Sequence, residues 1–434
     1  SLIGLFSAAI ASYVVGVSHS LAWVRAVLDL GGCLILFFLA VAAFRRHEHL
    51  VDTLTALAVS GLVVSAIGLV QYFVWPEMPG FPANALPAAT FGNRNLLAEY
   101  LAPATPMVLL LAYGARRAWR RWFAWGAAAL MLFCLVCTRT RAAWLGLAVV
   151  GAVTSYFWIP ALRRRAIKYE VSRLWSWAIV ACCTTICIIW FTTTVRPFWA
   201  QDKKGSPVQA LIGTTLQDPG IQERLAFWSG CVAMINDSPF LGVGAGQWLV
   251  HYPAYDLGRT VHNYGYARFP HSDPLQIAAE TGLVGLAFYA WFLVLILRML
   301  WRGARNEWGD RKAILVACLA SVVAFLVEGL FGFPGTQAST RALFWIVCGI
   351  GVTVAGTWES EERRVVGRTK TMTLTLGFLV FSLVALWASR QQVAADRQNM
   401  LASSLMRIDR PDLAAQEVEK AAPYGVWDPD ILFV

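Results

Sequence analysis

Long apolar runs, separated by short basic clusters, most constrain how this 434-residue chain can fold. A helix needs about 20 mostly apolar residues to cross the hydrocarbon core of a bilayer. About eleven runs reach that length, so the sequence predicts an all-α polytopic membrane protein. The runs cover 1–18, 22–44, 51–73, 95–114, 122–138, 142–160, 174–195, 273–299, 312–331, 341–357 and 371–390.

The first run begins abruptly at Ser1, without an initiator methionine. We therefore expect further N-terminal sequence in the full protein, with up to one more span, which would make twelve. No cleavable signal peptide is predicted.

The charge pattern predicts the orientation of these spans. The chain carries 36 Lys and Arg against 26 Asp and Glu, a net charge of +10, but only 14% of its residues are charged. Soluble proteins average about 25% charged residues. Every second connection is basic, which places five of them in the cytoplasm by the positive-inside rule. The basic residues fix topology in this interpretation, and no nucleic-acid partner is predicted. The five clusters lie near 45–46, 116–121, 163–173, 298–312 and 363–370.

This alternation divides the chain into four parts. Residues 1–195 hold the first seven spans, and 196–272 form one large outward loop, a length that usually carries function. Residues 273–390 hold the last four spans. Residues 391–434 read as an outward helical pair, like the start of a tetratricopeptide-type tail. Within the large loop, 221–236 has a helical apolar rhythm and predicts an amphipathic helix.

Arginines on the outward side are candidates for a binding site. Arg139 and Arg141 lie at the outer hairpin between the fifth and sixth spans, and Arg224 lies in the amphipathic helix. One interpretation is that the hairpin arginines anchor the protein to lipid phosphates, and that Arg224 is simply solvated. The other is an anion site, because the guanidinium is a permanently charged planar fork that suits phosphate.

Histidines gather in the same loop. The chain has six, and His251, His262 and His271 all lie there, with Arg268 close by. A neutral imidazole can act as a general base on a hydroxyl near neutral pH. Carboxylates and thiolates are too few nearby for a convincing metal site, so no metal and no cofactor are predicted.

Glycines and cysteines are interpreted structurally. Gly242, Gly244 and Gly246 do not match the dinucleotide fingerprint and predict a tight turn where the loop meets the membrane. The nine cysteines fall mainly inside predicted spans, including Cys134 and Cys137, and no disulfide is expected.

Three segments together resemble one family. They are Arg141-Ala-Ala-Trp-Leu, Arg224 ahead of the glycine-rich 239–246, and His271 followed after ten residues by Gly282-Leu-Val-Gly-Leu, with Glu280 two before that glycine. In order and spacing they resemble the O-antigen ligase and polymerase superfamily over roughly residues 50–360. Its members are bacterial inner-membrane glycosyltransferases of the GT-C type, which include protein O-oligosaccharyltransferases.

The resemblance implies an activity and roles for individual residues. It implies transfer of a glycan from undecaprenyl pyrophosphate to a hydroxyl of lipid A core, of a growing glycan or of a protein, at the periplasmic face. Arg141 and Arg224 match the arginines that hold the pyrophosphate, and His271 matches the histidine that activates or orients the acceptor. The segment 91–95 resembles variants with repeat tails. Second-rank candidates are Arg94, Arg139, His262, Arg268 and Glu280.

Alternatives remain open at this stage. The motifs do not separate a ligase, which the spacing after His271 favours, from a polymerase or a protein O-oligosaccharyltransferase. A transporter or lipid flippase also fits the number of spans, although such proteins usually bind substrate near the membrane midplane. Carboxylates inside or near spans are often functional, and here they are interpreted as structural or supporting. These carboxylates are Asp29, Glu99, Glu280 and Glu328.

Overall fold

The computed structural model is helical throughout the part of the chain that it describes. That part comprises residues 20–45, 47–81, 83, 85–164, 219–256 and 269–356, with isolated positions at 4, 7, 9, 11, 413, 416 and 419. Within it, β-structure is limited to an isolated bridge between Ala85 and Asn93. The long helices are α2 (Ser20–Ala43), α3 (His47–Phe73), α4 (Arg94–Gly114), α5 (Ala118–Thr138), α6 (Arg141–Arg164), α13 (Asp273–Asn306), α14 (Gly309–Phe331) and α15 (Ala338–Ala355).

Six of these helices are long and apolar enough to cross a membrane: α3, α4, α5, α13, α14 and α15. Shorter apolar stretches lie within α2, at Asp29–Ala43, and within α6, at Arg141–Phe157. The prediction of an all-α membrane protein is confirmed, whereas the predicted count of about eleven spans is not. The predicted spans at 174–195 and 371–390, and most of 1–18, lie outside the described residues.

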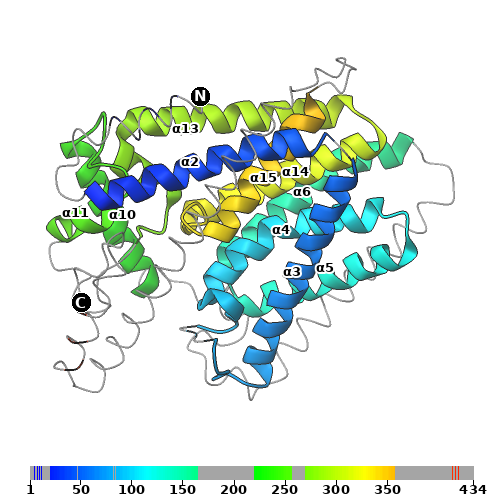
Figure 1. Ribbon diagram of the computed structural model, residues 1–434, viewed down its shortest axis with the longest axis horizontal. Coiled ribbons are helices and arrows are strands. Elements are labelled where there is room, and N and C mark those ends of the chain that lie inside the picture. The colour runs from blue at the N-terminus through cyan, green and yellow to red at the C-terminus, as the bar shows by residue number, and fades with distance from the viewer. Residues whose placement is uncertain are drawn as a thin grey trace, which may run out of the picture.

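Short connections make neighbouring helices antiparallel and give the bundle two chemically different ends (Figure 1). At the end that we call the basic end, α2 passes to α3, α4 to α5, and α13 to α14. Arg45, Arg116, Arg117 and Arg311 lie there. At the opposite end, which we call the site end, α5 passes to α6 and α14 passes to α15. Three of the five predicted basic clusters, near 45–46, 116–121 and 298–312, thus lie at one end of the described bundle.

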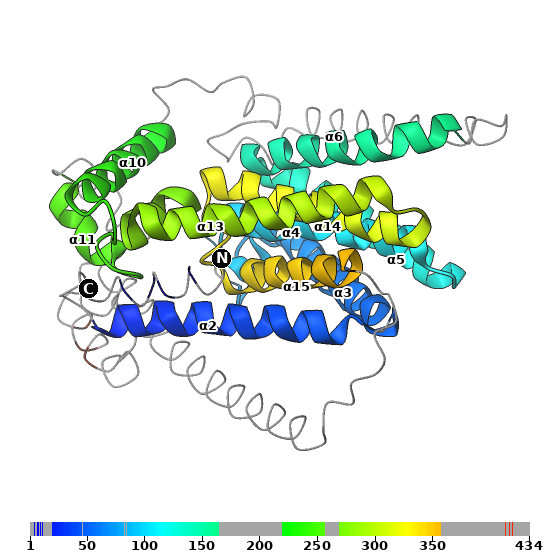
Figure 2. The same ribbon diagram turned by 90° about the horizontal axis from the view of Figure 1, so that it is seen from above.

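The site end carries two further helices from the large loop. They are α10 (Pro219–Asp237) and α11 (Trp248–Tyr255), which lie together beside the beginning of α13 in both views (Figures 1 and 2). The amphipathic helix predicted at 221–236 is confirmed as α10. Its buried side packs Phe227, Cys231 and Met234 against Trp248 and Tyr252 of α11. This small core attaches the loop to the bundle through α13.

Helix α13 is broken at Gly282, and the glycine-rich loop 239–246 forms hydrogen bonds with backbone groups on both sides of the break. Gly282 has φ 68° and ψ −175°, far from helical values. The carbonyls of Ala279 and Glu280 accept hydrogen bonds from the N–H groups of Val243, at 2.8 Å, and Gly244, at 3.0 Å. On the other side of the break, the N–H of Leu283 donates to the Pro239 carbonyl at 2.8 Å. Backbone groups freed by a kink inside a membrane need partners, and this loop provides them.

Glycine is required on both sides of this contact. Gly242, Gly244 and Gly246 have φ of 68°, 114° and 72°, in the region that side chains disfavour. A Cβ on Gly242 would also overlap the backbone at Glu280, and a Cβ on Gly282 would overlap the Phe240 carbonyl. The tight turn predicted from the three loop glycines is confirmed.

We predict that Gly282→Ala destabilises the protein by at least about 1–3 kcal/mol, because φ 68° with ψ −175° lies in a region that is essentially restricted to glycine, and a residue with a Cβ costs that much there before the overlap is counted. The measurement is the unfolding midpoint of the protein in detergent. The control is Gly126→Ala, in the middle of α5 with open space around it, which should stabilise the helix by about 0.5–1 kcal/mol. Equal midpoints for the two variants would contradict this account of the break.

Candidate functional site

Helix α10 presents one face to the site. Arg224, Phe227 and Trp228 are three and four residues apart, so they share a side of the helix. Phe227 is buried in the core with α11, and Trp228 Nε1 donates to the Pro270 carbonyl at 3.0 Å. These contacts tie α10 to the segment 269–271, which leads directly into α13.

His271 is held between two aromatic rings. Its imidazole stacks on Phe227, with centroids 6.1 Å apart and planes 13° apart, and meets the Phe333 ring edge-on at 4.9 Å. Its backbone has φ 56°, which is uncommon for a residue with a side chain and points to a functional constraint. His271 is thus fixed immediately before Ser272, where α13 begins.

Arg224 reaches across from α10 to the end of α14. Its Nη1 donates to the Phe331 carbonyl at 2.6 Å. Phe331 is the last residue of α14, where the helix dipole favours a cation. The guanidinium also interacts electrostatically with Glu99 of α4 and Glu328 of α14, both of which are buried. The predicted arginine therefore stands beside carboxylates of two spans.

His271 and Arg224 influence each other through charge. Burial, and to a lesser extent the positive charge of Arg224, together lower the pKa of His271 from 6.5 to about 4. The imidazole is therefore neutral at pH 7. That is the form that can accept a proton.

A second group of arginines lies at the beginning of α4 and of α6. Arg94 is the first residue of α4, which Asn93 caps by accepting from the Asn95 N–H at 2.9 Å. Arg141 is the first residue of α6 and is half-buried. Thr140 Oγ1 donates to Asn95 Oδ1 at 3.1 Å, which joins the two helix starts. The structure thus brings Arg94 and Arg141 to neighbouring helix ends.

Arg139, two residues before Arg141, is interior. It ends α5 in the left-handed conformation, with φ 53°, and its side chain is 0% exposed. Its guanidinium lies over the Tyr72 ring, 5.8 Å from the centroid. A fully buried guanidinium does not face lipid headgroups, so the anchoring interpretation does not apply to Arg139.

The turn 331–337, between α14 and α15, contacts α4 as well as Arg224 and His271. Glu99 of α4 lies one turn along the helix from Asn95, and its Oε1 accepts from the Phe333 N–H at 3.4 Å. Phe333 in turn contacts His271, and Phe331 holds Arg224. A chain of contacts therefore connects the start of α6, which carries Arg141, with Arg224 and His271, and it passes through α4 and this turn.

Glu280 binds the backbone of the glycine-rich loop and the start of α11. Its two carboxylate oxygens accept from the N–H groups of Gly246, at 2.9 Å, and Trp248, at 3.3 Å, at the beginning of α11. A carboxylate at a helix N-terminus is favourable. Of the other second-rank candidates, His262 and Arg268 lie outside the described residues.

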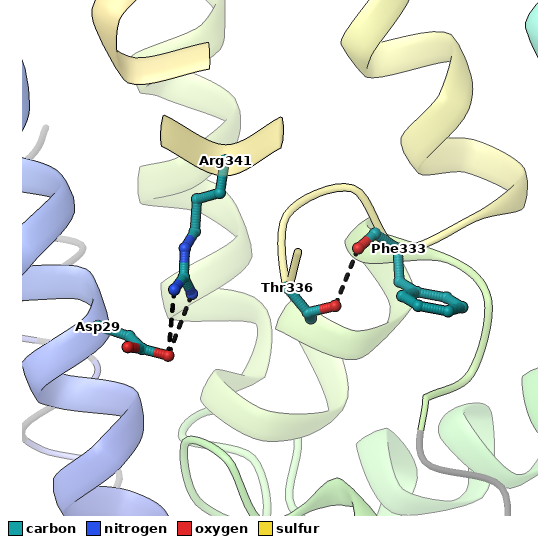
Figure 3. A network of polar contacts seen from close by, with 4 residues as sticks. All are labelled: Asp29, Phe333, Thr336 and Arg341. Carbon is teal, nitrogen blue, oxygen red and sulfur yellow. Dashed lines mark hydrogen bonds and ion pairs between the residues drawn. The ribbon is translucent and has the colours of Figure 1, made fainter. Parts of the chain in front are cut away.

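The sequence did not predict the aromatic residues that pack against His271, or the ion pair that Arg341 forms near this end of the bundle. Phe227 could have been found from its position three residues after Arg224 on the predicted helix. Phe333 and Arg341 left no signal of this kind. Arg341 lies in the first turn of α15 and forms an ion pair with Asp29 of α2, at 3.2 Å (Figure 3). Among the described residues, no group of three or more His, Cys, Asp or Glu could hold a metal ion.

Comparison with models of known protein families gives a match. Residues 126–290 match the family model described as O-antigen ligase. The matched stretch runs from α5 into α13 and contains Arg139, Arg141, Arg224, His271 and Glu280. No curated protein matches the chain. The resemblance predicted from the motifs is therefore confirmed in this part of the chain.

We predict that Arg224→Gln raises the pKa of His271 above about 4 but leaves it well below 6.5, because the substitution removes the positive charge while burial, the larger cause of the shift, stays in place. NMR titration of ring-labelled histidine checks this directly. A pKa that does not change would show that Arg224 is not close to the ring in solution.

The lowered pKa also predicts how stability depends on pH. Between about pH 4 and pH 6.5 the unfolded chain binds a proton at His271 and the folded protein does not. The contribution of this residue is therefore complete above pH 6.5 and is lost as the pH falls toward 4. His271→Gln should reduce this part of the slope when unfolding is measured across that range.

Proposed function

We propose that the protein is an O-antigen ligase-like glycosyltransferase of the bacterial inner membrane. The match over residues 126–290 supports an O-antigen ligase- or polymerase-like membrane enzyme. The observation that carries the finer proposal is the pairing of Arg224 with a neutral, ring-clamped His271 at the end of the bundle where α6 begins with Arg141. We take the donor to be a glycan on undecaprenyl pyrophosphate and the site to face the periplasm.

The charges suit the leaving group. When the bond to the sugar breaks, its electron pair goes to an oxygen of the pyrophosphate. Fixed arginines stabilise that growing negative charge without reorganising. We assign this role to Arg141 and Arg224, with Arg94 and Arg139 adding positive charge from the adjoining helix ends. In this proposal the arginines supply the charge that a divalent metal supplies elsewhere.

The acceptor hydroxyl must lose its proton as it attacks. Its oxygen forms a bond to the anomeric carbon from the side opposite to the leaving pyrophosphate, which inverts that carbon. The proton passes to the neutral imidazole of His271. A well-placed base of this kind contributes about 10²–10⁴-fold.

Donor binding would also make His271 a stronger base. The charge of Arg224 opposes protonation of the imidazole in the free protein. Pyrophosphate on Arg224 would offset that charge and so raise the pKa of His271. The base would thus become effective once the donor is in place.

The acceptor separates the closest alternatives. A ligase transfers to lipid A core, a polymerase to a growing lipid-linked glycan, and a protein O-oligosaccharyltransferase to a Ser or Thr hydroxyl. We favour the ligase, because the spacing from His271 to Gly282 resembles that group. Purified protein supplied with one labelled lipid-linked glycan and each acceptor in turn distinguishes the three.

We predict that Arg141→Ala and Arg224→Ala each reduce transfer by at least about 10²-fold, as removal of a donor to a developing anion typically does. His271→Ala should lose about 10²–10⁴-fold. The control is Arg116→Ala, an exposed arginine at the basic end, which should transfer normally. Full transfer by the His271→Ala protein would remove that residue from the mechanism.

The location of the site separates the enzyme from a transporter or flippase. We predict that cysteines placed at 141, 224 and 271 react with a membrane-impermeant maleimide added to the periplasmic side. A cysteine at 116 should react only after the membrane is opened. The described native cysteines are buried and add little background. If positions 141, 224 and 271 reacted only from the cytoplasmic side, the proposed orientation would be wrong.

A further inference from the structure

The turn 331–337 contacts both predicted functional groups on the α10 side of the site. Its sequence is Phe331-Gly-Phe-Pro-Gly-Thr-Gln337. The Phe331 carbonyl accepts the hydrogen bond from Arg224, and the Phe333 ring packs against His271. In the proposed reaction Arg224 acts on the donor and His271 on the acceptor. The residues that contact them, Phe331 and Phe333, are only two positions apart in the chain.

The turn is closed on itself. Thr336 donates to the Phe333 carbonyl twice. Its N–H donates at 3.0 Å, and its hydroxyl donates at 2.9 Å (Figure 3). Pro334 follows Phe333 and fixes one backbone angle, as is common at this position of a turn. The Phe333 ring also stacks on Phe269, with centroids 4.8 Å apart. The ring is therefore set by a rigid backbone rather than by a flexible loop.

Two buried carboxylates attach the turn to the bundle. Asp273 Oδ2 accepts from the Gly335 N–H at 2.9 Å, and Glu99 Oε1 accepts from the Phe333 N–H at 3.4 Å. Asp273 is 5% exposed and Glu99 is 2% exposed, so neither bond competes with bulk water. A Cβ on Gly335 would lie 2.9 Å from Asp273 Oδ2, which explains why glycine stands there.

Asp273 closes a ring of contacts that includes His271. The aspartate follows His271 by two residues and is the first residue of α13. It holds Gly335, the turn connects Gly335 to Phe333, and the Phe333 ring returns to His271. A displacement of the turn would therefore displace the imidazole, and through Phe331 it would also displace Arg224.

We propose that the turn 331–337 is a positioning platform shared by Arg224 and His271, and that Asp273 is the positioning residue that sets it. This inference rests on the proposed function, because it states how donor and acceptor groups are kept in register. A purely structural role is the alternative, since an acidic residue in the first turn of a helix is stabilising by itself. The experiment must separate these two roles.

The variants are Asp273→Ala, Asp273→Asn and a matched control, Ser321→Ala. Asn keeps an oxygen that can accept from Gly335, whereas Ala does not. Ser321 lies in α14, where its hydroxyl donates to the Pro103 carbonyl at 2.7 Å in the buried bundle. The control thus loses a buried hydrogen bond of α14, the helix that leads into the turn, at a place away from the turn. Each protein is measured for unfolding midpoint, kcat, KM for the lipid-linked donor, and the pKa of His271 by NMR.

We expect Asp273→Ala to lower kcat/KM by about 10²-fold, the loss that a misplacement of about 1 Å can produce. KM for the donor should rise and kcat should fall, because both groups move. The pKa of His271 should rise from about 4 as water reaches the ring. Asp273→Asn should restore most of the activity and the low pKa, and Ser321→Ala should lose stability only.

A second variant keeps the test open if Asp273→Ala does not fold. Phe333→Leu removes the ring from His271 and leaves the Arg224 bond to Phe331 in place, so kcat should fall while KM for the donor stays near the wild-type value. Normal kcat and an unchanged His271 pKa in Asp273→Ala, or in Phe333→Leu, would overturn the platform. Absence of transfer by the wild-type protein would instead overturn the proposed function.

Discussion

The hydrogen bonds that repair α13 at Gly282 hold the rest of the site together. A backbone break within a spanning helix exposes groups that lipid cannot satisfy. Here the loop 239–246 supplies both donors and acceptors, so the loop is bound to the helix by main-chain contacts. Helices α10 and α11 flank that loop and pack through Phe227 and Trp248. The position of Arg224 and the stacking partner of His271 follow from this attachment.

Charge has different functions at the two ends of the bundle. Arginines at the basic end accompany short connections and match the orientation rule for membrane proteins. At the site end, Arg224 and Arg341 lie against helix ends and carboxylates of neighbouring helices. Burial and the positive charge of Arg224 lower the pKa of His271 and leave it neutral in the free protein. The net charge of +10 therefore says little about partners until each arginine is assigned to one end.

Much of the architecture could be predicted because bilayer thickness sets a length that apolar runs reveal directly. The helix α10, its Arg224 and the glycine turn at 242–246 were also accessible, because each has a local pattern. The break at Gly282 was not, since a glycine in an apolar helix usually continues the helix. The burial of Arg139 and the role of Phe333 depend on contacts between segments far apart in the chain, and no local pattern encodes those.

The order of segments along the chain has a consequence for biosynthesis. The loop 239–246 precedes Gly282, so the ribosome makes the repairing segment before it makes the break. When α13 enters the membrane, the partners for its unpaired backbone groups already exist in the nascent protein. A chain with the two segments in reverse order would have to keep an incomplete helix in lipid until the loop arrived. The loop that carries the site is therefore already made when this span needs it.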